Sequence, residues 1–327
     1  MTDYLYGGAS LRALETAIIG RERIAKIVDA RSLTDAYSLL SEYGVELIKD
    51  TDSGAVLREP TLLKILKDAY DTVLSLGNDS NALRLWLYPY DCNNLKACIK
   101  CTVRNINPLP LMFDFGTVPI LNIPTMVKER SFQAFPKAMA EAASEAIGAY
   151  EKTKNPQLID LLLDRACYCD MLNAANKSQN AYIQNLVTLK IDFTNLLMAV
   201  RVFRMNSGEA GQALLQNAWL RGGKLSLSDV LKGGEQEVER FLKQTPYASI
   251  FDALSPNNSL GALECAMDNA WMSAVQEAKW IPIGVEGMVS FLLAHEYEVK
   301  NLRIALSGKE IGHSPTMIRE RIRESYV

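Results

Sequence analysis

The sequence contains no long apolar run and no secretory leader, and these two absences restrict where the protein can work. Across its 327 residues no stretch approaches the roughly 20 apolar residues that cross a bilayer, so we expect no membrane-spanning helix. The first residues, Met1-Thr-Asp-Tyr4, lack the basic and apolar sections of a secretory signal. We therefore expect a cytoplasmic protein whose contact with a membrane runs only through protein partners.

Histidine is scarce, and the six cysteines do not form a metal-ligand pattern. Of the two histidines, His295 begins a stretch that resembles a zinc-protease motif, but Val299 stands where the second histidine ligand would be. Cys98-x-x-Cys101 is the one cysteine pair with redox or metal spacing, whereas zinc needs about four ligands. We expect reduced thiols on helix faces and no bound metal.

Motifs for nucleotide binding and covalent catalysis are missing as well. Gly223-Lys224 and Gly308-Lys309 lack both the Ser or Thr and the earlier glycine of a phosphate-binding loop. No Gly-x-Gly-x-x-Gly follows a strand, and no Gly-x-Ser-x-Gly nucleophile elbow occurs. Asp160-x-x-x-Asp164 is the nearest approach to paired magnesium-binding aspartates, and we interpret it as a salt-bridged or solvated helix face. We predict no catalytic residue and no cofactor.

The charge is nearly balanced, and the apolar residues follow a helical period. With 35 basic and 38 acidic residues, the chain lacks the general basic surface that binds nucleic acid or an anionic membrane. Apolar stripes at helical spacing recur, as in Leu11, Leu14 and Ile18 of a helix expected over 10–28. No run alternates like a strand or closes a hairpin. We predict an all-α fold.

A short helical signature occurs three times, about a hundred residues apart, and divides the chain into thirds. An acid is followed three residues later by Asn and then by Leu, so the acid and this pair share one helix face. This repetition predicts three helical repeat domains, at 1–115, 116–222 and 223–327. The copies are Asp91, Asn94 and Leu95; Asp192, Asn195 and Leu196; and Glu298, Asn301 and Leu302.

The signature has two possible roles. The acid and the asparagine could form a binding site, but three copies would then make three sites. The plainer interpretation is structural: a buried asparagine bridges backbone groups of a neighbouring helix, and the acid satisfies the start of its own helix or pairs with Lys or Arg. Basic residues beside the signatures, such as Lys96, Lys100 and Arg303, could line a shared polar surface or face solvent.

Turn-forming residues separate the thirds and end the signature helices. We expect these helices to end at Asn105, at Asn206-Ser-Gly208 and at Ser307-Gly308. The proline-rich segment 105–124 is the first linker, and its apolar centre should pack rather than float. Trp219-Leu-Arg-Gly-Gly-Lys224 is the second linker and occupies the same relative place. Both linkers carry glycines and aromatic residues that we expect to be exposed.

Three stretches carry a resemblance to a known family. They are the aromatic start and Arg-containing first helix of Tyr4–Glu15, the Asp-x-x-Asn-Leu-Lys element within Tyr90–Lys96, and the ending Glu298–Lys309. In this order they resemble the C subunit of A-type and V-type ATPases/ATP synthases, equivalent to the d subunit of eukaryotic vacuolar enzymes. The likeness spans nearly the whole chain. Leu197, where a basic residue is usual, and Ser10-Leu11, where another arginine is common, depart from the family pattern and weaken the prediction of particular interface contacts.

The resemblance implies three similar helical domains that form a funnel around a pseudo-threefold axis. Such a protein is a non-catalytic central-stalk subunit at the cytoplasmic face of a membrane. It couples a rotating shaft of D- and F-type subunits to the proteolipid ring during ion transport, either of protons or of sodium. We expect shaft contacts at Phe113, Phe115, Trp219 and Arg221. The alternative is an all-helical scaffold or adaptor unrelated to rotary ATPases.

Overall fold

A computed structural model describes residues 14–76, 81–205, 208–245, 247–254, 259–281 and 284–327. In these ranges the protein is helical, with a single isolated β-bridge between Lys49 and Val56 and no strand, which confirms the all-α prediction. The chain divides into two compact units. One unit combines the chain up to residue 79 with residues from 245 onwards, and the other comprises residues 80–244.

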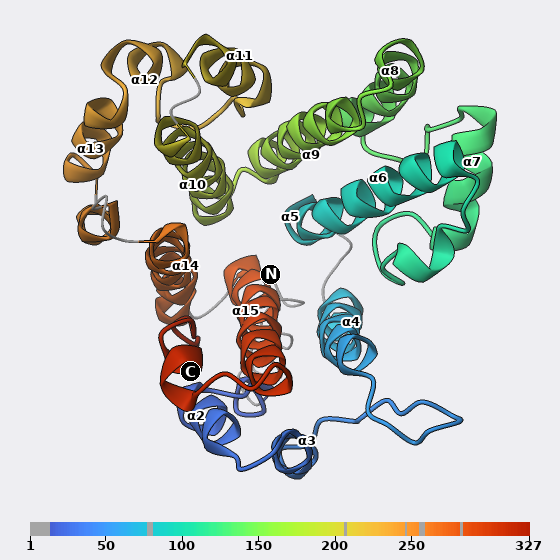
Figure 1. The fold of residues 1–327 in the computed structure, drawn as a ribbon, viewed down its shortest axis with the longest axis vertical. Helices are drawn as coiled ribbons and strands as arrows, with labels where there is room; N and C mark the ends of the chain where they lie inside the picture. The colour runs from blue at the N-terminus through green and yellow to red at the C-terminus, as the bar shows by residue number, and fades with distance from the viewer. Residues whose placement is uncertain (1–13, 77–80, 206–207, 246, 255–258, 282–283) are drawn as a thin grey trace. The chain divides into compact units, whose positions relative to one another are not determined.

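The first unit is built around one long, buried helix, α15 (Val285–Glu310), which contacts helices from both ends of the chain (Figure 1). Every residue from Met288 to Ala294 is buried, and all of them except Ser290 are apolar. Short 3-10 helices in this unit are η4 (Ala248–Leu254) and η5 (Glu277–Trp280). The helices around α15 are α2 (Arg21–Asp29), α3 (Leu33–Glu42), α4 (Arg58–Leu76), α14 (Leu260–Gln276) and α16 (Pro315–Arg319).

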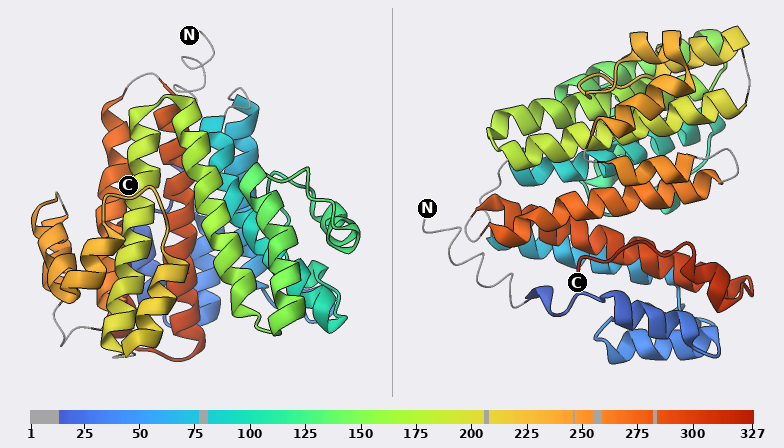
Figure 2. Two further views of the ribbon diagram at one scale, coloured as in Figure 1. Left: turned by 90° about the horizontal axis from the view of Figure 1, so that it is seen from above. Right: turned by 90° about the vertical axis from the view of Figure 1, so that its left-hand side faces the viewer.

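The second unit contains an antiparallel hairpin of α8 (Lys137–Thr153) and α9 (Gln157–Ser178), which lie side by side in Figures 1 and 2. The small buried side chains of Ala142, Ala143 and Ala146 belong to α8. Helices α6 (Tyr88–Arg104) and α10 (Ala181–Arg204) both contact α9. The remaining elements are α5 (Asn81–Arg84), η1 (Leu85–Leu87), η2 (Leu109–Leu111), η3 (Ile120–Asn122), α7 (Ile123–Glu129), α11 (Gly208–Ala218), α12 (Leu227–Gly233) and α13 (Glu235–Lys243).

Two expected helix boundaries are wrong. The helix predicted over 10–28 is interrupted: residues 10–13 lie outside the described part, a turn occupies 16–18, and α2 begins only at Arg21. The break allows the backbone N–H of Ile19 to reach a buried glutamate instead of continuing a helical hydrogen-bond ladder. The third signature helix continues past Gly308 to Glu310. Gly308 serves packing there, because an added Cβ would lie 2.6 Å from Cγ1 of Ile318 on α16.

The expected helix end at Asn105 agrees with the structure. Asn105 ends α6 in the left-handed conformation, with φ 53°, and Ser314 caps α16 by accepting a hydrogen bond from the N–H of Met317. Gly234, with φ 58°, stands between α12 and α13. The second expected helix end falls partly on residues 206–207, which lie outside the described ranges. The division into three domains and their arrangement as a funnel stay predictions.

Candidate functional site

The polar residues of all three signatures lie in the protein interior, near the start of α6 and at the middle of α10 and α15. The acids are at most 5% exposed and the asparagines are fully buried. The leucine of each copy is also fully buried. Buried carboxylates and amides are costly unless they find hydrogen-bond partners, so their surroundings must supply these partners.

Each signature asparagine holds the backbone of one residue that follows its helix. Asn94 Nδ2 donates to the carbonyl of Phe113 (3.0 Å), and Asn94 Oδ1 accepts from the N–H of the same residue (2.7 Å). Asn195 makes the same pair with Leu220, at 2.9 Å for both bonds. Asn301 repeats the arrangement with Arg323, at 3.0 and 2.8 Å. One side chain thus satisfies both polar groups of a residue in a returning segment.

The acids of the first two signatures bind the same returning segments slightly further along. Asp91 accepts hydrogen bonds from the N–H groups of Thr117 (2.9 Å) and Val118 (3.2 Å) and from the hydroxyl of Thr117 (2.5 Å). Asp192 accepts from the N–H of Leu225 (2.9 Å). The acid and the asparagine therefore fix each segment at two points.

In the third copy the two side chains hold different parts of the chain. Asn301 binds Arg323 in the C-terminal segment, whereas Glu298 accepts from the N–H of Ile19 near the other end of the chain (2.9 Å). His295, one helical turn before Glu298, contacts its second oxygen at 2.5 Å. The third signature therefore ties both ends of the described chain to α15.

These partners differ from the expected ones. The sequence interpretation placed the asparagine against backbone groups of a neighbouring helix and the acid against its own helix start or a nearby Lys or Arg. In the structure both bind backbone of non-helical segments, because a segment outside a helix carries N–H and C=O groups that have no ladder partner. The acid and the asparagine lie on the same helix face, so both reach the same side.

Glycines in the two linkers allow this close approach, which sequence reasoning missed. A Cβ atom added at Gly116 would lie 2.4 Å from Oδ1 of Asp91, and one added at Gly223 would lie 2.2 Å from Oδ1 of Asp192. Both distances are too short for any real pair of atoms, so only glycine fits. A glycine near the same place in both linkers was the available signal.

Burial changes the acidity of the signature aspartates. Desolvation raises the pKa of Asp91 to about 6, although the hydrogen bonds from Thr117 and Val118 oppose the shift. Desolvation also raises the pKa of Asp192, opposed by the backbone N–H groups of Leu225 and Lys224. A carboxyl with a raised pKa binds its proton more tightly in the folded state than in the unfolded state. Ionising it on raising the pH therefore costs stability.

We predict a stability profile that depends on Asp91. Between its ordinary pKa of 3.8 and about 6, the folded state keeps a proton that the unfolded state has lost. The contribution of this carboxyl should thus fall by about 2 kcal/mol from about pH 4.5 to about pH 6.5. Asp91→Asn removes this contribution. The unfolding free energy of the variant should therefore decline less than that of the wild type, or rise more, between these pH values. Urea unfolding at several pH values measures the slopes, and the exposed Asp71→Asn is the control. Parallel wild-type and Asp91→Asn profiles would contradict the prediction.

The expected partner-contact residues occupy two different environments. Phe113 and Phe115 are half-buried, and both pack against Tyr90, with ring-centroid distances of 5.5 and 4.3 Å. Arg221 is exposed. Trp219 is only 8% exposed, so the expectation of an exposed aromatic residue there is wrong.

The asparagine bonds explain why Trp219 is buried. Asn94 binds Phe113 and Asn195 binds Leu220, which makes these two residues structural counterparts. Trp219 therefore corresponds to Met112, which is buried as well, with 9% exposed. Matching the linkers by their aromatic residues places them one residue out of register, because aromatic residues alone do not reveal which residue the asparagine holds.

Several basic residues near the signatures pair with acids on adjacent helices. Lys96 and Lys100 on α6 contact Asp164 and Asp160 on α9, the second pair at 2.6 Å. Arg303 on α15 pairs with Glu59 on α4 at 3.0 Å. The spaced aspartates of α9 are thus salt-bridged, in agreement with the interpretation of Asp160-x-x-x-Asp164 as a structural helix face.

Over the described ranges, no group of three His, Cys, Asp or Glu side chains is placed to hold a metal ion. Within the same part of the chain, no helix combines the length and the apolar character that a membrane span needs. The geometry thus defines two polar anchors in the second unit, each of which holds a half-exposed linker, and a third anchor of the same kind in the first unit.

Comparison with known proteins identifies a family whose sequence model the chain matches and several proteins to which it is similar. Residues 8–321 match the sequence model of the family described as ATP synthase (C/AC39) subunit. The C subunit of the A-type ATP synthase of Methanocaldococcus jannaschii is 21% identical, over 98% of this chain and 86% of that protein. The corresponding C subunit of Halorubrum lacusprofundi, also of an A-type ATP synthase, is 24% identical, over 97% and 96%. The C subunit of the V-type sodium ATPase of Enterococcus hirae is 23% identical, over 74% and 75%.

Proposed function

Because residues 8–321 match its sequence model, the chain belongs to the ATP synthase (C/AC39) subunit family, and we propose that it is the non-catalytic central-stalk C subunit of a rotary ATPase. In this role it connects the rotating shaft, made of D- and F-type subunits, to the proteolipid ring at the cytoplasmic face of the membrane. It transmits torque for ion transport and changes no substrate covalently. The family match over nearly the full chain is the observation that carries the proposal.

The packing of the described units supports a mechanical role. A part that transmits torque must resist deformation, and closely packed helices do so because protein interiors are hardly compressible. The signature side chains add two-point fixation, since Asp91 with Asn94 and Asp192 with Asn195 tie returning segments to helix cores. Linkers held in this way can present a fixed surface to a partner.

We place the shaft contact on the exposed parts of the two linkers. Phe115 and Arg221 are the strongest candidates, because Phe115 is half-exposed beside Tyr90 and Arg221 is exposed after the anchored Leu220. Arginine and aromatic residues contribute much of the energy at protein interfaces. Phe113 contributes its partly exposed ring, whereas Trp219 supports the second linker from the interior.

We predict that the double variant Phe115→Ala/Arg221→Ala binds purified D- and F-type shaft subunits about tenfold or more weakly than the wild type. The cause is the loss of an aromatic contact and an exposed guanidinium, neither of which is fully buried in the free protein. Surface plasmon resonance with the immobilised shaft measures the affinity. The exposed Lys128→Ala on α7 is the matched control for loss of surface charge.

Wild-type affinity in the double variant would reject these linkers as the contact, provided that its unfolding midpoint is unchanged.

Affinity purification of the tagged chain from membranes tests the proposed role in the complex. Shaft and proteolipid subunits should co-purify, and their absence would reject the proposed function. Family membership already decides against a helical scaffold unrelated to rotary ATPases.

A further inference from the structure

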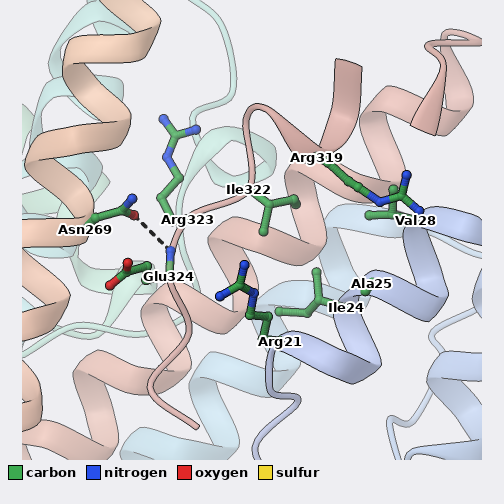
Figure 3. A pocket seen from close by; sticks show the side chains of 9 residues that line it. All are labelled: Arg21, Ile24, Ala25, Val28, Asn269, Arg319, Ile322, Arg323 and Glu324. Atoms are coloured by element: carbon green, nitrogen blue, oxygen red, sulfur yellow. Dashed lines mark hydrogen bonds between the residues drawn. The ribbon is translucent and has the colours of Figure 1, made fainter. Parts of the chain in front are cut away.

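The hollow shown in Figure 3 has a volume of about 430 Å³ and offers little open apolar surface. Ile24 and Val28 line it from α2, but both side chains are buried. Arg323 also lines it, and its guanidinium pairs with Asp268 at 2.9 Å. A concentration of apolar side chains that a partner can reach lies instead in the second unit, on the linker that joins α6 to α7.

The first linker, residues 105–124, exposes two leucines that its own packing does not use. Leu111 is 65% exposed and Leu121 is 72% exposed. The linker buries other apolar side chains, among them Val118 and Ile123, so its attachment to the unit does not need the two leucines. Exposing large aliphatic side chains to water is unfavourable, and an apolar region on the surface of a soluble protein is typical of a contact with a partner.

The backbone around both leucines is fixed. Each leucine lies in a short 3-10 helix, η2 or η3. The N–H groups of Leu111 and Asn122 each donate to the carbonyl three residues earlier, at 2.9 and 3.0 Å. The segment between the two turns is held by Asn94 and Asp91 of α6. A partner that binds the leucines therefore does not have to order this part of the chain first, which lowers the cost of binding.

The charge of the first linker restricts the chemistry of an occupant. No lysine or arginine occurs between residues 105 and 124, and the one acid of this segment, Asp114, is exposed. A surface that binds an anionic membrane carries basic residues beside its apolar ones. The centre of a protein interface is instead poor in charged residues. The linker therefore fits an apolar surface of another protein.

We infer that Leu111 and Leu121 extend the shaft contact and pack against an apolar surface of the D- and F-type subunits. The inference rests on the proposed function, because that function supplies the shaft. In the sequence the two leucines flank Phe113 and Phe115, whose half-exposed rings belong to the proposed contact, so the apolar residues continue on both sides of it. Burial of aliphatic side chains gives binding a negative heat-capacity change and is not screened by salt.

The test uses the double variant Leu111→Gln/Leu121→Gln in the full chain, with Met205→Gln as control. Met205 is 74% exposed in the same unit and lies outside both linkers. Binding of the purified shaft is measured by isothermal titration calorimetry at several temperatures and at low and high salt. We expect the double variant to bind about tenfold more weakly at both salt concentrations, with a less negative heat-capacity change. Met205→Gln should bind like the wild type.

A conservative variant separates the apolar contact from an effect on folding. Leu111→Met/Leu121→Met keeps apolar side chains of similar size, so it should bind the shaft with wild-type affinity. Binding as weak as that of the glutamine variant would show that apolar character is not the cause, and would overturn the inference. Both leucines are largely exposed, so neither double variant should change the unfolding midpoint.

The remaining outcomes separate the function from the inference. If the wild type does not bind the shaft, the proposed function fails. If the wild type binds and the glutamine variant binds with equal affinity and equal heat-capacity change, the function stands and the inference is overturned. Sedimentation velocity and flotation with vesicles of phosphatidylcholine and phosphatidylserine test two other occupants. Self-association or vesicle binding that the glutamine variant loses, together with unchanged shaft affinity, would also overturn the inference.

Discussion

Replacing Asn195 with alanine should lower the free energy of unfolding by about 4 kcal/mol. The substitution removes both hydrogen bonds to Leu220, which is only 3% exposed, so its N–H and C=O would lie in the core without partners. Each unpaired buried polar group costs about 1–3 kcal/mol, and the lost side-chain volume leaves a cavity. Urea unfolding followed by circular dichroism measures the change.

The first signature supplies a graded comparison and a neighbouring control. Asn94→Ala should cost less than Asn195→Ala, about 2 kcal/mol, because its partner Phe113 is only half-buried and water can replace part of the loss. Asn93 precedes it on α6 and is exposed, so Asn93→Ala should change stability by no more than about 0.5 kcal/mol. Equal effects of Asn93→Ala and Asn94→Ala would refute the anchoring role.

Gly223→Ala should destabilise the protein by about 3 kcal/mol. The new methyl group would lie 2.2 Å from Oδ1 of Asp192 and 3.1 Å from Cγ2 of Ile191, so either the linker or the carboxylate must move. Movement breaks the hydrogen bond from the N–H of Leu225 and leaves a buried carboxylate poorly solvated. Gly148 within α8 is the control, because an added Cβ there meets nothing within 4 Å.

Gly148→Ala should instead stabilise the protein by about 0.5–1 kcal/mol, since alanine loses less backbone freedom than glycine in a helix. A double-mutant cycle then isolates the clash. In the background of Asp192→Ala the carboxylate is gone, so Gly223→Ala should cost clearly less than in the wild type. Additive effects would show that the collision with Asp192 is not the cause.

Much of the helical framework could be predicted from the sequence. Helical periodicity identified the all-helical class, and Asn105 marked a helix end that depends on local chemistry alone. The resemblance to the C subunit of A-type and V-type enzymes is confirmed by the family match. The predictions failed where a local signal had a distant cause. Gly308 resembles a helix end, yet it lies inside α15 against Ile318, ten residues further along the chain.

The candidate site was likewise predicted only in part. The repeated acid and asparagine were visible in the sequence, and their burial is a natural consequence of the leucine that shares their helix face. Their partners were not visible, because hydrogen bonds from Asn195 to Leu220 or from Glu298 to Ile19 depend on how the intervening chain folds back. The burial of Trp219 followed from that same register.

The order of residues alone determined the helical class, the family and the three polar signatures, because helical periodicity and short motifs act over a few residues. Only the folded chain decided which backbone groups those signatures hold and why glycine must stand at 116 and 223. These features depend on atoms that are far apart in the sequence and meet only in the folded chain. Such long-range contacts produce no periodic pattern from which they could be predicted. Desolvation, which raises the pKa of Asp91, likewise exists only once the surrounding side chains exclude water.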